Sequence, residues 1–524
     1  MGKRQREVDA VAYEYRRYPF VPPPGLFASE ERHPVIVVGA GPVGLAAALD
    51  LAGHGIPSVV LDDNDLVSVG SRAICWSKRT LEILDRLGVG TACVEKGVTW
   101  KIGRTYHRDT EVFSFDLLPE EGHKMPAFVN LQQYYVEEYL IAAAEASDLV
   151  DLRFKNRVTA AEPGNEHVRV SVETPDGSYW LDASFLVACD GARSPIRAML
   201  GLEFEGLLFE ERFLIADIEM AGDFPPERRF WFEPTFHFGQ SALLHKQPDN
   251  IYRIDLQLGW DADPETENHL DRIRPRIEKV VGHGEFNIDW HSVYTFQCRR
   301  LERFVHGRVI FAGDSAHLVS PFGARGGNGG IQDVNALGWR LAAVVRGNAP
   351  LALLGHYDAE RTYGADENIL SSTRSTRFMS PTNGAERWFR DAVLALAERT
   401  EFARPMINSG RLSVPCVYPL EAPDAEILPT VSRPGAVAPD APQGTGWLVD
   451  SLGGEVRLLA LGEAGEGVGV PVLRPKFNDA IRSRYLGEAG EAWYLIRPDQ
   501  VVAARWTAYD AAAIAHETAR LWEG

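Results

Sequence analysis

The stretch PVIVVGAGPVGLAAALDLAGHGIPSVVLDD, at residues 34–63, constrains the fold more than any other part of this chain. A short apolar run, a glycine turn, a run of small residues with helical spacing and a second β-branched run follow one another. This order predicts a strand, a helix and a second strand. Because a strand-helix-strand unit pairs its two strands in parallel, the stretch predicts an α/β fold.

The turn in this unit has the pattern Gly-x-Gly-x-x-Gly, formed by Gly39, Gly41 and Gly44, with Pro42 opening the helix. The first glycine permits a tight turn, the second lets the backbone approach a pyrophosphate, and the third lets helix and strand pack closely. Asp62 closes the second strand, where a carboxylate would accept ribose hydroxyls. The pattern predicts a dinucleotide site, and the alternative is an ordinary glycine turn.

Two later segments repeat the combination of a strand with a glycine and an acid. Residues 185–197 (FLVACDGARSPIR) contain Asp190-Gly191, and residues 308–321 (RVIFAGDSAHLVSP) contain Gly313-Asp314. Directly behind the second segment lies FGARGGNGGIQD, residues 322–333. This glycine run predicts either a slack surface loop or bare backbone against a flat or anionic ligand. We favour the second, because the run leads straight into a helix and the strand ends are expected to converge on one elongated ligand.

These three motifs, in this order, resemble the single-component FAD-dependent aromatic hydroxylases, which include para-hydroxybenzoate and 3-(3-hydroxyphenyl)propionate hydroxylases. The resemblance covers about residues 33–370. It implies that FAD is the cofactor, that NADH or NADPH is the reductant, and that a phenolic or related aromatic substrate is hydroxylated with O2 through a C4a-hydroperoxyflavin. A role in the catabolism of aromatic compounds fits this class.

The fold class expected from the resemblance is α/β with α+β elements. It has a Rossmann-like FAD-binding domain of the para-hydroxybenzoate hydroxylase type, an inserted antiparallel-sheet substrate domain, and a C-terminal domain that looks thioredoxin-like. That last domain has no Cys-x-x-Cys pair, so no redox role is expected for it. The expected segments are an N-terminal arm (1–32), the FAD-binding domain (33–200 and 301–370), the substrate sheet (201–300), a helical segment (371–412) and the C-terminal domain (413–524). Pro22 to Pro24 predict that the arm is extended.

The resemblance also implies roles for individual residues. The cofactor-binding positions that it implies are Gly39, Gly41, Pro42 and Gly44 for the pyrophosphate, Asp62 for the adenosine ribose, Arg72 and Gln133 for further contacts, Asp190 and Gly191 for FAD and the nicotinamide, Gly313 and Asp314 for the ribityl side, and Pro321, Gly326, Gly327 and Asn328 beside the isoalloxazine ring. For Arg72 and Gln133 the alternative is an ordinary polar residue.

The glycine loop departs from the family at Arg325. Relatives commonly show Pro-x-Gly-Gly-Gln-Gly-apolar-Asn, whereas this chain has Arg325 in place of the glutamine and Gly327 in place of the apolar residue. We therefore place Arg325 and Pro321 among the candidate catalytic residues. The identity of the group that Arg325 contacts stays open.

The candidates for substrate chemistry lie in the aromatic-rich middle of the chain. His237 and Tyr252 are the candidate catalytic bases or hydrogen-bond partners that we single out, and His245, His291 and Tyr294 are further ones. The aromatic residues that would line an apolar pocket are Phe230, Trp231, Phe232, Phe236 and Phe238. The arginines that would anchor a substrate carboxylate are Arg228, Arg229, Arg253, Arg299 and Arg300. For each of these sets, ordinary core or surface residues are the alternative.

Charge and composition exclude several other functions. The net charge of −19 at pH 7 disfavours nucleic acid and anionic membranes as partners, because both bind basic surfaces. Five cysteines without a Cys-x-x-Cys pair disfavour a disulfide framework and a zinc site, and no metal is expected. The chain shows neither a secretory signal nor an apolar run long enough for a membrane helix, so we expect a cytoplasmic protein. A homodimer is compatible with these features.

Two other classes of function remain as alternatives. The first is another flavoprotein of the same fold, such as an FAD-linked reductase or a halogenase, although the WxWxIP motif of the tryptophan-type halogenases is absent. The second is a non-catalytic binding member of the fold, as in Rab escort and GDP-dissociation inhibitor proteins. The intact phosphate glycines, Asp190 and Asp314 argue against this second class.

Overall fold

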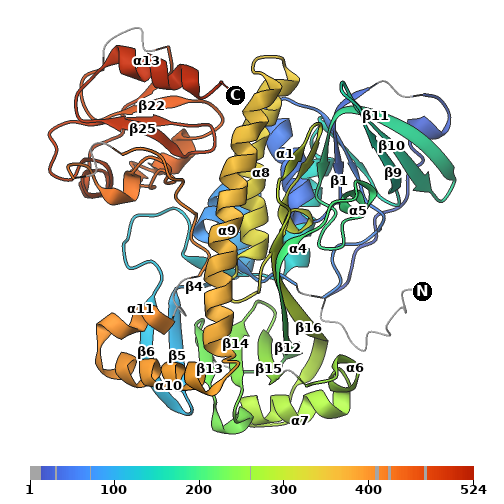
Figure 1. Ribbon diagram of the computed structural model, residues 1–524, viewed down its shortest axis with the longest axis vertical. Coiled ribbons are helices and arrows are strands. Elements are labelled where there is room, and N and C mark those ends of the chain that lie inside the picture. The colour runs from blue at the N-terminus through green and yellow to red at the C-terminus, as the bar shows by residue number, and fades with distance from the viewer. Residues whose placement is uncertain are drawn as a thin grey trace.

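Three parts surround a pair of long central helices in the computed structural model (Figure 1). The structure describes residues 13–29, 32–70, 72–222, 224–259, 261–407, 412–422, 426–464 and 469–523. An α/β domain and a C-terminal domain flank one end of the helix pair, and a large sheet lies at its other end (Figure 1). No helix within these residues is both long and apolar enough to cross a bilayer.

The α/β domain is built on a sheet whose central strands are parallel, as the strand-helix-strand unit predicts. Its strand order is β17 (Val305–His306), β18 (Val309–Phe311), β11 (Gly177–Ala188), β1 (His33–Val38), β2 (Ser58–Leu61), β8 (Val150–Arg153), with β10 (Val168–Thr174) and β9 (Arg157–Pro163) extending β11. The ends of β1, β2, β11 and β18 lie side by side, because Val38 pairs with both Leu61 and Ala188, and Ala188 pairs with Phe311. The three strand-and-acid motifs therefore lie together at one sheet edge, which confirms the predicted convergence of the strand ends.

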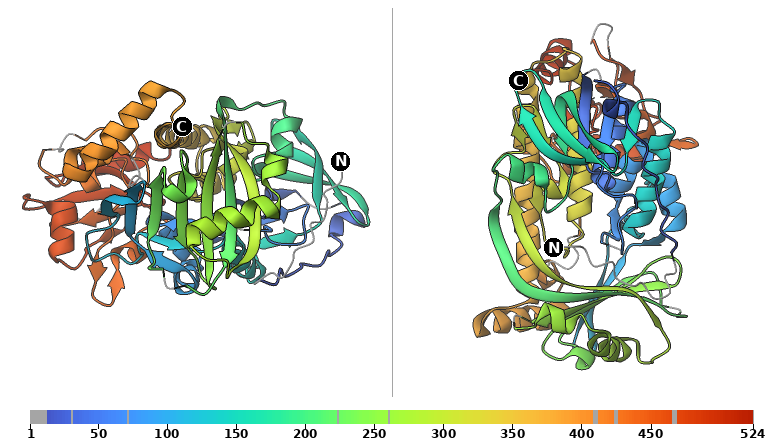
Figure 2. Two further views of the ribbon diagram at one scale, coloured as in Figure 1. Left: turned by 90° about the horizontal axis from the view of Figure 1, so that it is seen from below. Right: turned by 90° about the vertical axis from the view of Figure 1, so that its right-hand side faces the viewer.

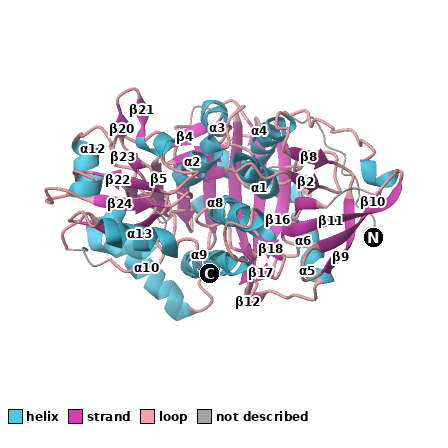
Figure 3. Cartoon of the chain, turned by 90° about the horizontal axis from the view of Figure 1, so that it is seen from above, coloured by secondary structure: helices cyan, strands magenta, loops and turns pink. Residues whose placement is uncertain are grey.

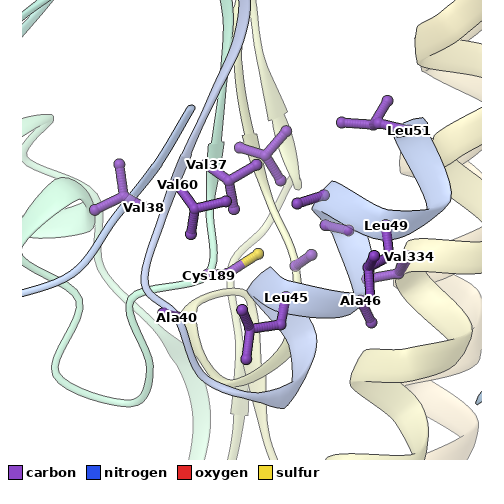
Figure 4. Close-up of a cluster of buried hydrophobic side chains, with 14 of the residues drawn as sticks. Val37, Val38, Ala40, Leu45, Ala46, Leu49, Leu51, Val60, Cys189 and Val334 are labelled. Carbon is purple, nitrogen blue, oxygen red and sulfur yellow. The ribbon is translucent and has the colours of Figure 1, made fainter. Parts of the chain in front are cut away.

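Helices α1 (Pro42–Gly53) and α8 (Gly326–Val345) cover this sheet, and α9 (Leu354–Met379) packs against α8 (Figure 3). Figure 4 shows Val37 and Val60 of the sheet facing Leu45 and Leu49 of α1, with Val334 of α8 beyond them. The small residues of α1 permit this close layering. A Cβ atom at Gly338 of α8 would lie 1.7 Å from a carboxylate oxygen of Asp50, so α1 and α8 are in direct contact there.

The second large sheet has eight strands and corresponds to the inserted sheet domain that the resemblance implies; we call it the substrate sheet after the role expected for it. Its order is β19 (His317–Leu318), β16 (Asn287–Arg300), β12 (Glu205–Glu219), β15 (Ile251–Gly259), β14 (Ser241–Lys246), β13 (Arg228–Phe232), β5 (Ile102–His107), β6 (Thr110–Asp116). Helix α7 (Leu270–Val281) crosses its outer face, and α10 (Gly384–Arg399) packs against β6 (Figure 2). The predicted boundaries of 201–300 are too narrow, because β5 and β6 come from the first segment of the chain and add a parallel partner to β13.

A smaller three-stranded sheet joins the two domains. It consists of β3 (Cys75–Ser77), β7 (Phe128–Asn130) and β4 (Val98–Trp100). Helices α2 (Lys78–Arg86) and α3 (Gly90–Lys96) come between β3 and β4 in the chain, and α4 (Gln133–Glu145) follows β7. The predicted helical segment, 371–412, contains the end of α9 followed by α10.

The N-terminal arm packs against the α/β domain. The ring of Tyr13 stacks on that of Tyr134 with centroids 4.0 Å apart, and Tyr18 is buried. The prediction of an extended arm is wrong at Pro24–Leu26, which form a single 3₁₀ turn. Proline is suited to the first position of such a turn because its φ angle is already helical.

The C-terminal domain has a four-stranded sheet in the order β23 (Val472–Leu473), β22 (Arg457–Ala460), β24 (Trp493–Ile496), β25 (Val502–Trp506), followed by α13 (Ala511–Arg520). It docks through the β24–β25 hairpin. Arg497 donates to Glu360 of α9 at 2.6 and 2.9 Å, and Arg79 of α2 donates to Gln500 at 2.6 Å. Arg497 also binds Asp499, which lies near Arg340 of α8.

The ion pairs at this docking site make the stability of the folded protein depend on pH. Burial alone would raise the pKa of Asp499, but Arg497 and Arg340 outweigh burial and lower it to about 2. A carboxylate whose pKa is lower in the folded state stabilises the protein above its unfolded value, and that stabilisation is lost as the pH falls. We expect the wild type to lose stability relative to Asp499→Asn between about pH 4 and pH 2, measured by circular dichroism during acid titration. Parallel acid titration curves for the two proteins would contradict this.

Candidate active site

One cavity of about 2000 Å³ extends from the glycine turn at β1–α1 to the inner face of the substrate sheet. Its wall includes Gly41, Asp190, Asp314 and Gly326 on the α/β side and Asp255 on the sheet side. Pockets for small ligands usually measure about 300–1,000 Å³. The cavity can therefore hold an elongated cofactor and a second molecule together.

The glycine turn has the shape that a pyrophosphate requires. Gly39 has φ +104°, and a Cβ there would lie 2.5 Å from the carbonyl oxygen of Cys189. A Cβ at Gly44 would lie 1.9 Å from the carbonyl oxygen of Gly39, whereas Gly41 has open space and lines the cavity. Helix α1 begins at Pro42 without a side-chain cap, so its first amide hydrogens are available to an anion. These residues fit the pyrophosphate of FAD.

Asp62 lies at the end of β2 and lines the same cavity. Its carboxylate accepts hydrogen bonds from the amides of Ala40 at 2.6 Å and Asn64 at 2.7 Å. Burial raises the pKa of Asp62, and these two amides oppose that shift. The carboxylate thus holds the glycine turn in place at the position predicted for the adenosine ribose.

Arg72 and Gln133 also lie on the cavity wall. Arg72 is exposed there, whereas Gln133 accepts a hydrogen bond from the amide of Ala73 at 3.1 Å and donates to Glu137 at 2.7 Å. Glu137 is buried and accepts from the amide of Ser68 at 2.5 Å. Gln133 therefore ties α4 to the segment that carries Arg72.

The second motif places Asp190 and Gly191 on the α/β side of the cavity wall. Asp190 accepts from the amide of Ile196 at 3.0 Å through Oδ2, while its buried Oδ1 has no hydrogen-bond partner among the described residues. Ser194 caps α5 (Pro195–Met199) by accepting from the amide of Arg197. A buried carboxylate oxygen without a partner costs free energy, and a ligand hydroxyl would satisfy it.

Asp314 faces the cavity from the third motif, and burial raises its pKa. Gly313 is not on the wall. Its φ is +67°, and its amide donates to Asp333 at 2.9 Å.

Asp333 is a residue of this site whose role the sequence does not reveal. It is fully buried in α8 and also accepts from His317 Nε2 at 2.6 Å and from Arg361 Nε at 2.7 Å. Burial alone would raise the pKa of Asp333, but the charges of His317 and Arg361 outweigh burial and lower it. One carboxylate thus fixes the Gly313–Asp314 turn to α8 and α9. The only signal in the sequence is an acid among the apolar residues of a helix.

The glycine loop serves two purposes. Gly326, Gly327 and Asn328 line the cavity at the start of α8, as the resemblance implies. Gly329 and Gly330 do not, since a Cβ at Gly330 would lie 2.6 Å from a methyl group of Val43. The interpretation of the whole run as bare backbone against a ligand is therefore wrong for these two glycines. Gly330 lets α8 pack on α1 and the Gly313 turn, and Gly329 lies against His317 and against Asn368 of α9.

Pro321 and Arg325 also lie on the wall, and Arg325 does so with a largely buried side chain. Its guanidinium donates to Asn368 of α9 at 3.0 Å. Asn328 accepts from the amide of Ser77 at 2.9 Å and donates to the carbonyl of Cys75 at 2.8 Å. Asn328 thus joins the start of α8 to β3.

The structure does not place His237 or Tyr252 on the cavity wall. His237 Nε2 lies 2.6 Å from the carbonyl oxygen of Gln257, and the hydroxyl of Tyr252 donates to the carbonyl of Gly222 at 2.7 Å. Tyr252 belongs to the core beneath α7, on the far face of the sheet. Neither side chain therefore faces the cavity. Tyr252 lies on the far face of β15, because side chains alternate between the two faces of a strand, and His237 lies in the 3₁₀ turn Thr235–His237.

Several further candidates also lie elsewhere. Arg300 pairs with Asp366, and Arg229 pairs with Glu227. The candidates absent from the wall are His291, Arg229, Arg299, Arg300, Phe230, Trp231, Phe232, Phe236 and Phe238. The aromatic residues that do line the cavity are Tyr15, Trp76, Trp100, Trp290, Tyr294, Phe296 and Phe322.

The sheet wall carries Arg228, His245, Arg253 and Asp255. His245 pairs with Arg253 across β14 and β15, and Arg253 donates two hydrogen bonds of 2.9 Å to Asp217 of β12. Burial and the two arginines lower the pKa of His245. Arg228, Arg253 and His245 are among the residues predicted from the sequence, whereas Asp255 is not. Within the described residues, no group of three or more His, Cys, Asp or Glu side chains could hold a metal ion.

Comparison with known proteins agrees with this geometry. The FAD binding domain family matches residues 32–371. A 3-(3-hydroxy-phenyl)propionate/3-hydroxycinnamic acid hydroxylase of Mycolicibacterium smegmatis is 29% identical over 361 residues, which cover 69% of this chain and 64% of that protein. The 12-dehydrotetracycline 5-monooxygenase/anhydrotetracycline 6-monooxygenase of Streptomyces rimosus subsp. rimosus is 30% identical over 431 residues, which cover 77% and 82%.

The crystal structure of the flavin-dependent monooxygenase PieE in complex with FAD and substrate superposes with a TM-score of 0.77 at 21% identity, covering 94% of this chain and 99% of that one. The chain spans just under two thirds of the length of the M. smegmatis hydroxylase. The family match covers the three motifs and both parts of the α/β domain. The chain therefore belongs to the FAD binding domain family, in its class A aromatic hydroxylase group.

Proposed function

We propose that this protein is an FAD-dependent monooxygenase that consumes NADH or NADPH and hydroxylates a phenolic or related aromatic substrate. The observation that carries the proposal is the single cavity, which places the dinucleotide motifs and the substrate sheet on two walls of one space. When bound, FAD would supply the redox chemistry with the nicotinamide and O2. The protein's own residues then have to orient the cofactor and substrate and exclude water.

The start of α8 is suited to stabilise negative charge where it lines the cavity. The amides of Gly326, Gly327 and Asn328 lie in the first turn of a helix of 20 residues, where they have no carbonyl partner within the helix. Together with the helix dipole they favour negative charge, and glycine keeps the approach free of side chains. Pro321 and Phe322 cover the neighbouring wall.

The named relatives support an aromatic substrate without identifying it. One is named as a hydroxylase of 3-(3-hydroxy-phenyl)propionate and 3-hydroxycinnamic acid, and another as a monooxygenase of 12-dehydrotetracycline and anhydrotetracycline. The lining aromatics and the cavity's volume suit either a single ring or a fused one. We propose that the C-terminal domain is thioredoxin-like. It docks on the rest of the protein, since Arg497 and Gln500 hold it against α9 and α2.

The proposal is tested on the purified protein. A hydroxylase should be yellow, should oxidise NADH or NADPH faster when its phenol is added, and should consume O2 and release a hydroxylated product. A panel of phenols and phenolic acids would find the substrate. A colourless protein that takes up no FAD would overturn the proposal in favour of a binding role. A yellow one that turns over without O2 would be a reductase.

Arg325 offers a test of coupling between reductant use and hydroxylation. We expect Arg325→Gln to keep FAD but to lower the yield of product per NAD(P)H by roughly two- to tenfold, because the bond to Asn368 that holds the loop is lost. Product and NAD(P)H are measured in the same reaction. Asn368→Ala removes the other partner and should act in the same direction. Unchanged coupling in both variants would show that this contact does not position the loop.

A further inference from the structure

Asp255 stands out on the sheet wall because its side chain is half-buried and one of its carboxylate oxygens, Oδ1, is buried and incompletely bonded. On β15, Tyr252, Ile254 and Leu256 pack into the core beneath α7, so Arg253 and Asp255 face the cavity. Asp255 Oδ1 has no hydrogen-bond partner among the described residues. A buried carboxylate in this condition is costly, and a hydrogen-bond donor on a bound ligand would remove that cost.

The charged and titratable groups around Asp255 come from five strands, including β3 with Cys75. They are Asp217 on β12, Arg228 on β13, His245 on β14, Arg253 on its own strand, and the thiol of Cys75, which lies 4.0 Å from His245. Arg253 is neutralised by its two bonds to Asp217. The charges of Arg228 and Asp255 act on each other across β14.

The charges on this wall therefore balance. Two arginines face two aspartates, and His245, with its lowered pKa, is neutral. A substrate carboxylate would find no surplus positive charge here and would meet the carboxylate of Asp255. A hydroxyl group, in contrast, can donate its proton to Asp255 and present its oxygen to Arg228.

We propose that Asp255 accepts a hydrogen bond, and then the proton, from the phenolic hydroxyl of the substrate, and that Arg228 stabilises the oxyanion that remains. In this step the O–H bond of the phenol breaks, an O–H bond forms on Asp255, and the negative charge moves to the substrate oxygen. The resulting phenolate is the more nucleophilic form of the ring. This inference rests on the proposed function and deepens it by naming the substrate group that the sheet wall recognises.

The pH dependence follows from the state of Asp255 in the free protein. Burial raises the pKa of Asp255 to about 6, against the opposing charges of Arg253 and Arg228. Only the ionised form accepts a proton, so recognition of a hydroxyl should strengthen as the pH rises through about 6.

The experiment compares 2-naphthol with its methyl ether, 2-methoxynaphthalene, by equilibrium dialysis against the FAD-containing protein without reductant. At pH 8 the wild type should bind the naphthol about 10- to 100-fold more tightly than the ether, because a hydrogen bond to a buried charge is then available. This preference should fall as the pH is lowered through about 6. In Asp255→Asn it should be at least about fivefold smaller and should no longer change between pH 5 and 8.

Asp271→Asn is the matched control, because this exposed aspartate lies on α7, on the far face of the sheet. It should behave as the wild type does. A wild-type protein without preference for the naphthol, or an Asp255→Asn variant that keeps the preference and its pH dependence, would overturn the inference. If the variant does not fold, the presence or absence of the wild-type pH dependence decides.

The assay needs neither turnover nor O2, so it separates this inference from the proposed function. A preference for the naphthol in a protein that hydroxylates no phenol would overturn the function and leave the recognition of hydroxyls standing. If the protein hydroxylates phenols but Asp255→Asn keeps the wild-type preference for the naphthol, the proposed function stands and the inference about Asp255 is overturned.

Discussion

Gly44→Ala is expected to yield a folded protein that has lost most of its FAD. The added Cβ would lie 1.9 Å from the carbonyl oxygen of Gly39, so the turn that faces the pyrophosphate must move. Overpacking of this kind costs about 1–3 kcal/mol or more, which corresponds to roughly a 10- to 100-fold weaker affinity for FAD. The visible absorption of the purified protein and a titration of the FAD-free protein with FAD measure the effect.

Gly53→Ala is the matched control, because Gly53 lies in the same helix and a Cβ there would meet nothing within 4 Å. It should keep FAD and gain up to about 1 kcal/mol of stability, since alanine loses less backbone entropy than glycine. Equal FAD content in the two variants would contradict the role assigned to the turn. Far-ultraviolet circular dichroism shows whether Gly44→Ala has kept its fold.

Asp333→Ala is expected to cause the largest loss of stability among single substitutions in the α/β domain. Removal of this carboxylate leaves Arg361 buried without its anionic partner and frees the amide of Gly313 and the ring of His317. Removing one partner of a buried ion pair typically costs about 3–5 kcal/mol. Thermal and urea unfolding followed by circular dichroism measure the change, and FAD affinity should fall because the turn that carries Asp314 is loosened.

Asp366→Ala provides the comparison for this prediction, because Asp366 lies on α9 and pairs with Arg300 at the exposed surface. Exposed ion pairs are worth about 0–1 kcal/mol, so this variant should unfold close to the wild type. Similar losses of unfolding free energy in the two variants would show that Asp333 contributes no more to stability than an exposed ion pair. Should Asp333→Ala not accumulate, Asp333→Asn keeps the shape of the side chain and tests the loss of charge alone.

The motifs at the strand ends could be predicted from the sequence because each depends on local geometry. A glycine turn between a strand and a helix fixes the position of the cofactor's phosphates, and parallel strands bring their carboxyl ends to one edge. Gly41, Asp62, Asp190 and Asp314 accordingly lie on one cavity wall. The order of these motifs along the chain is therefore sufficient to predict that they meet at one site.

The sheet wall could not be predicted in the same way. Strand alternation in IYRIDLQLG separates Tyr252 from Arg253 and Asp255, but the sequence does not say which of the two faces is covered by α7. That choice depends on a helix that follows in the chain and on strands from distant segments. The packing glycines of α8 likewise have the same sequence signature as those on the cavity wall, and only their neighbours distinguish them.

The split origin of the substrate sheet matters for anyone who wishes to exchange specificity between relatives. Strands β5 and β6 precede the rest of the sheet by about 90 residues of intervening chain, yet β5 completes the edge of β13, the strand that carries Arg228. A chimera that transplants only residues 201–300 would present a foreign β13 to a native β5, with mismatched side chains along their shared register. Specificity in this scaffold is thus a property of two gene segments, and they have to be moved together.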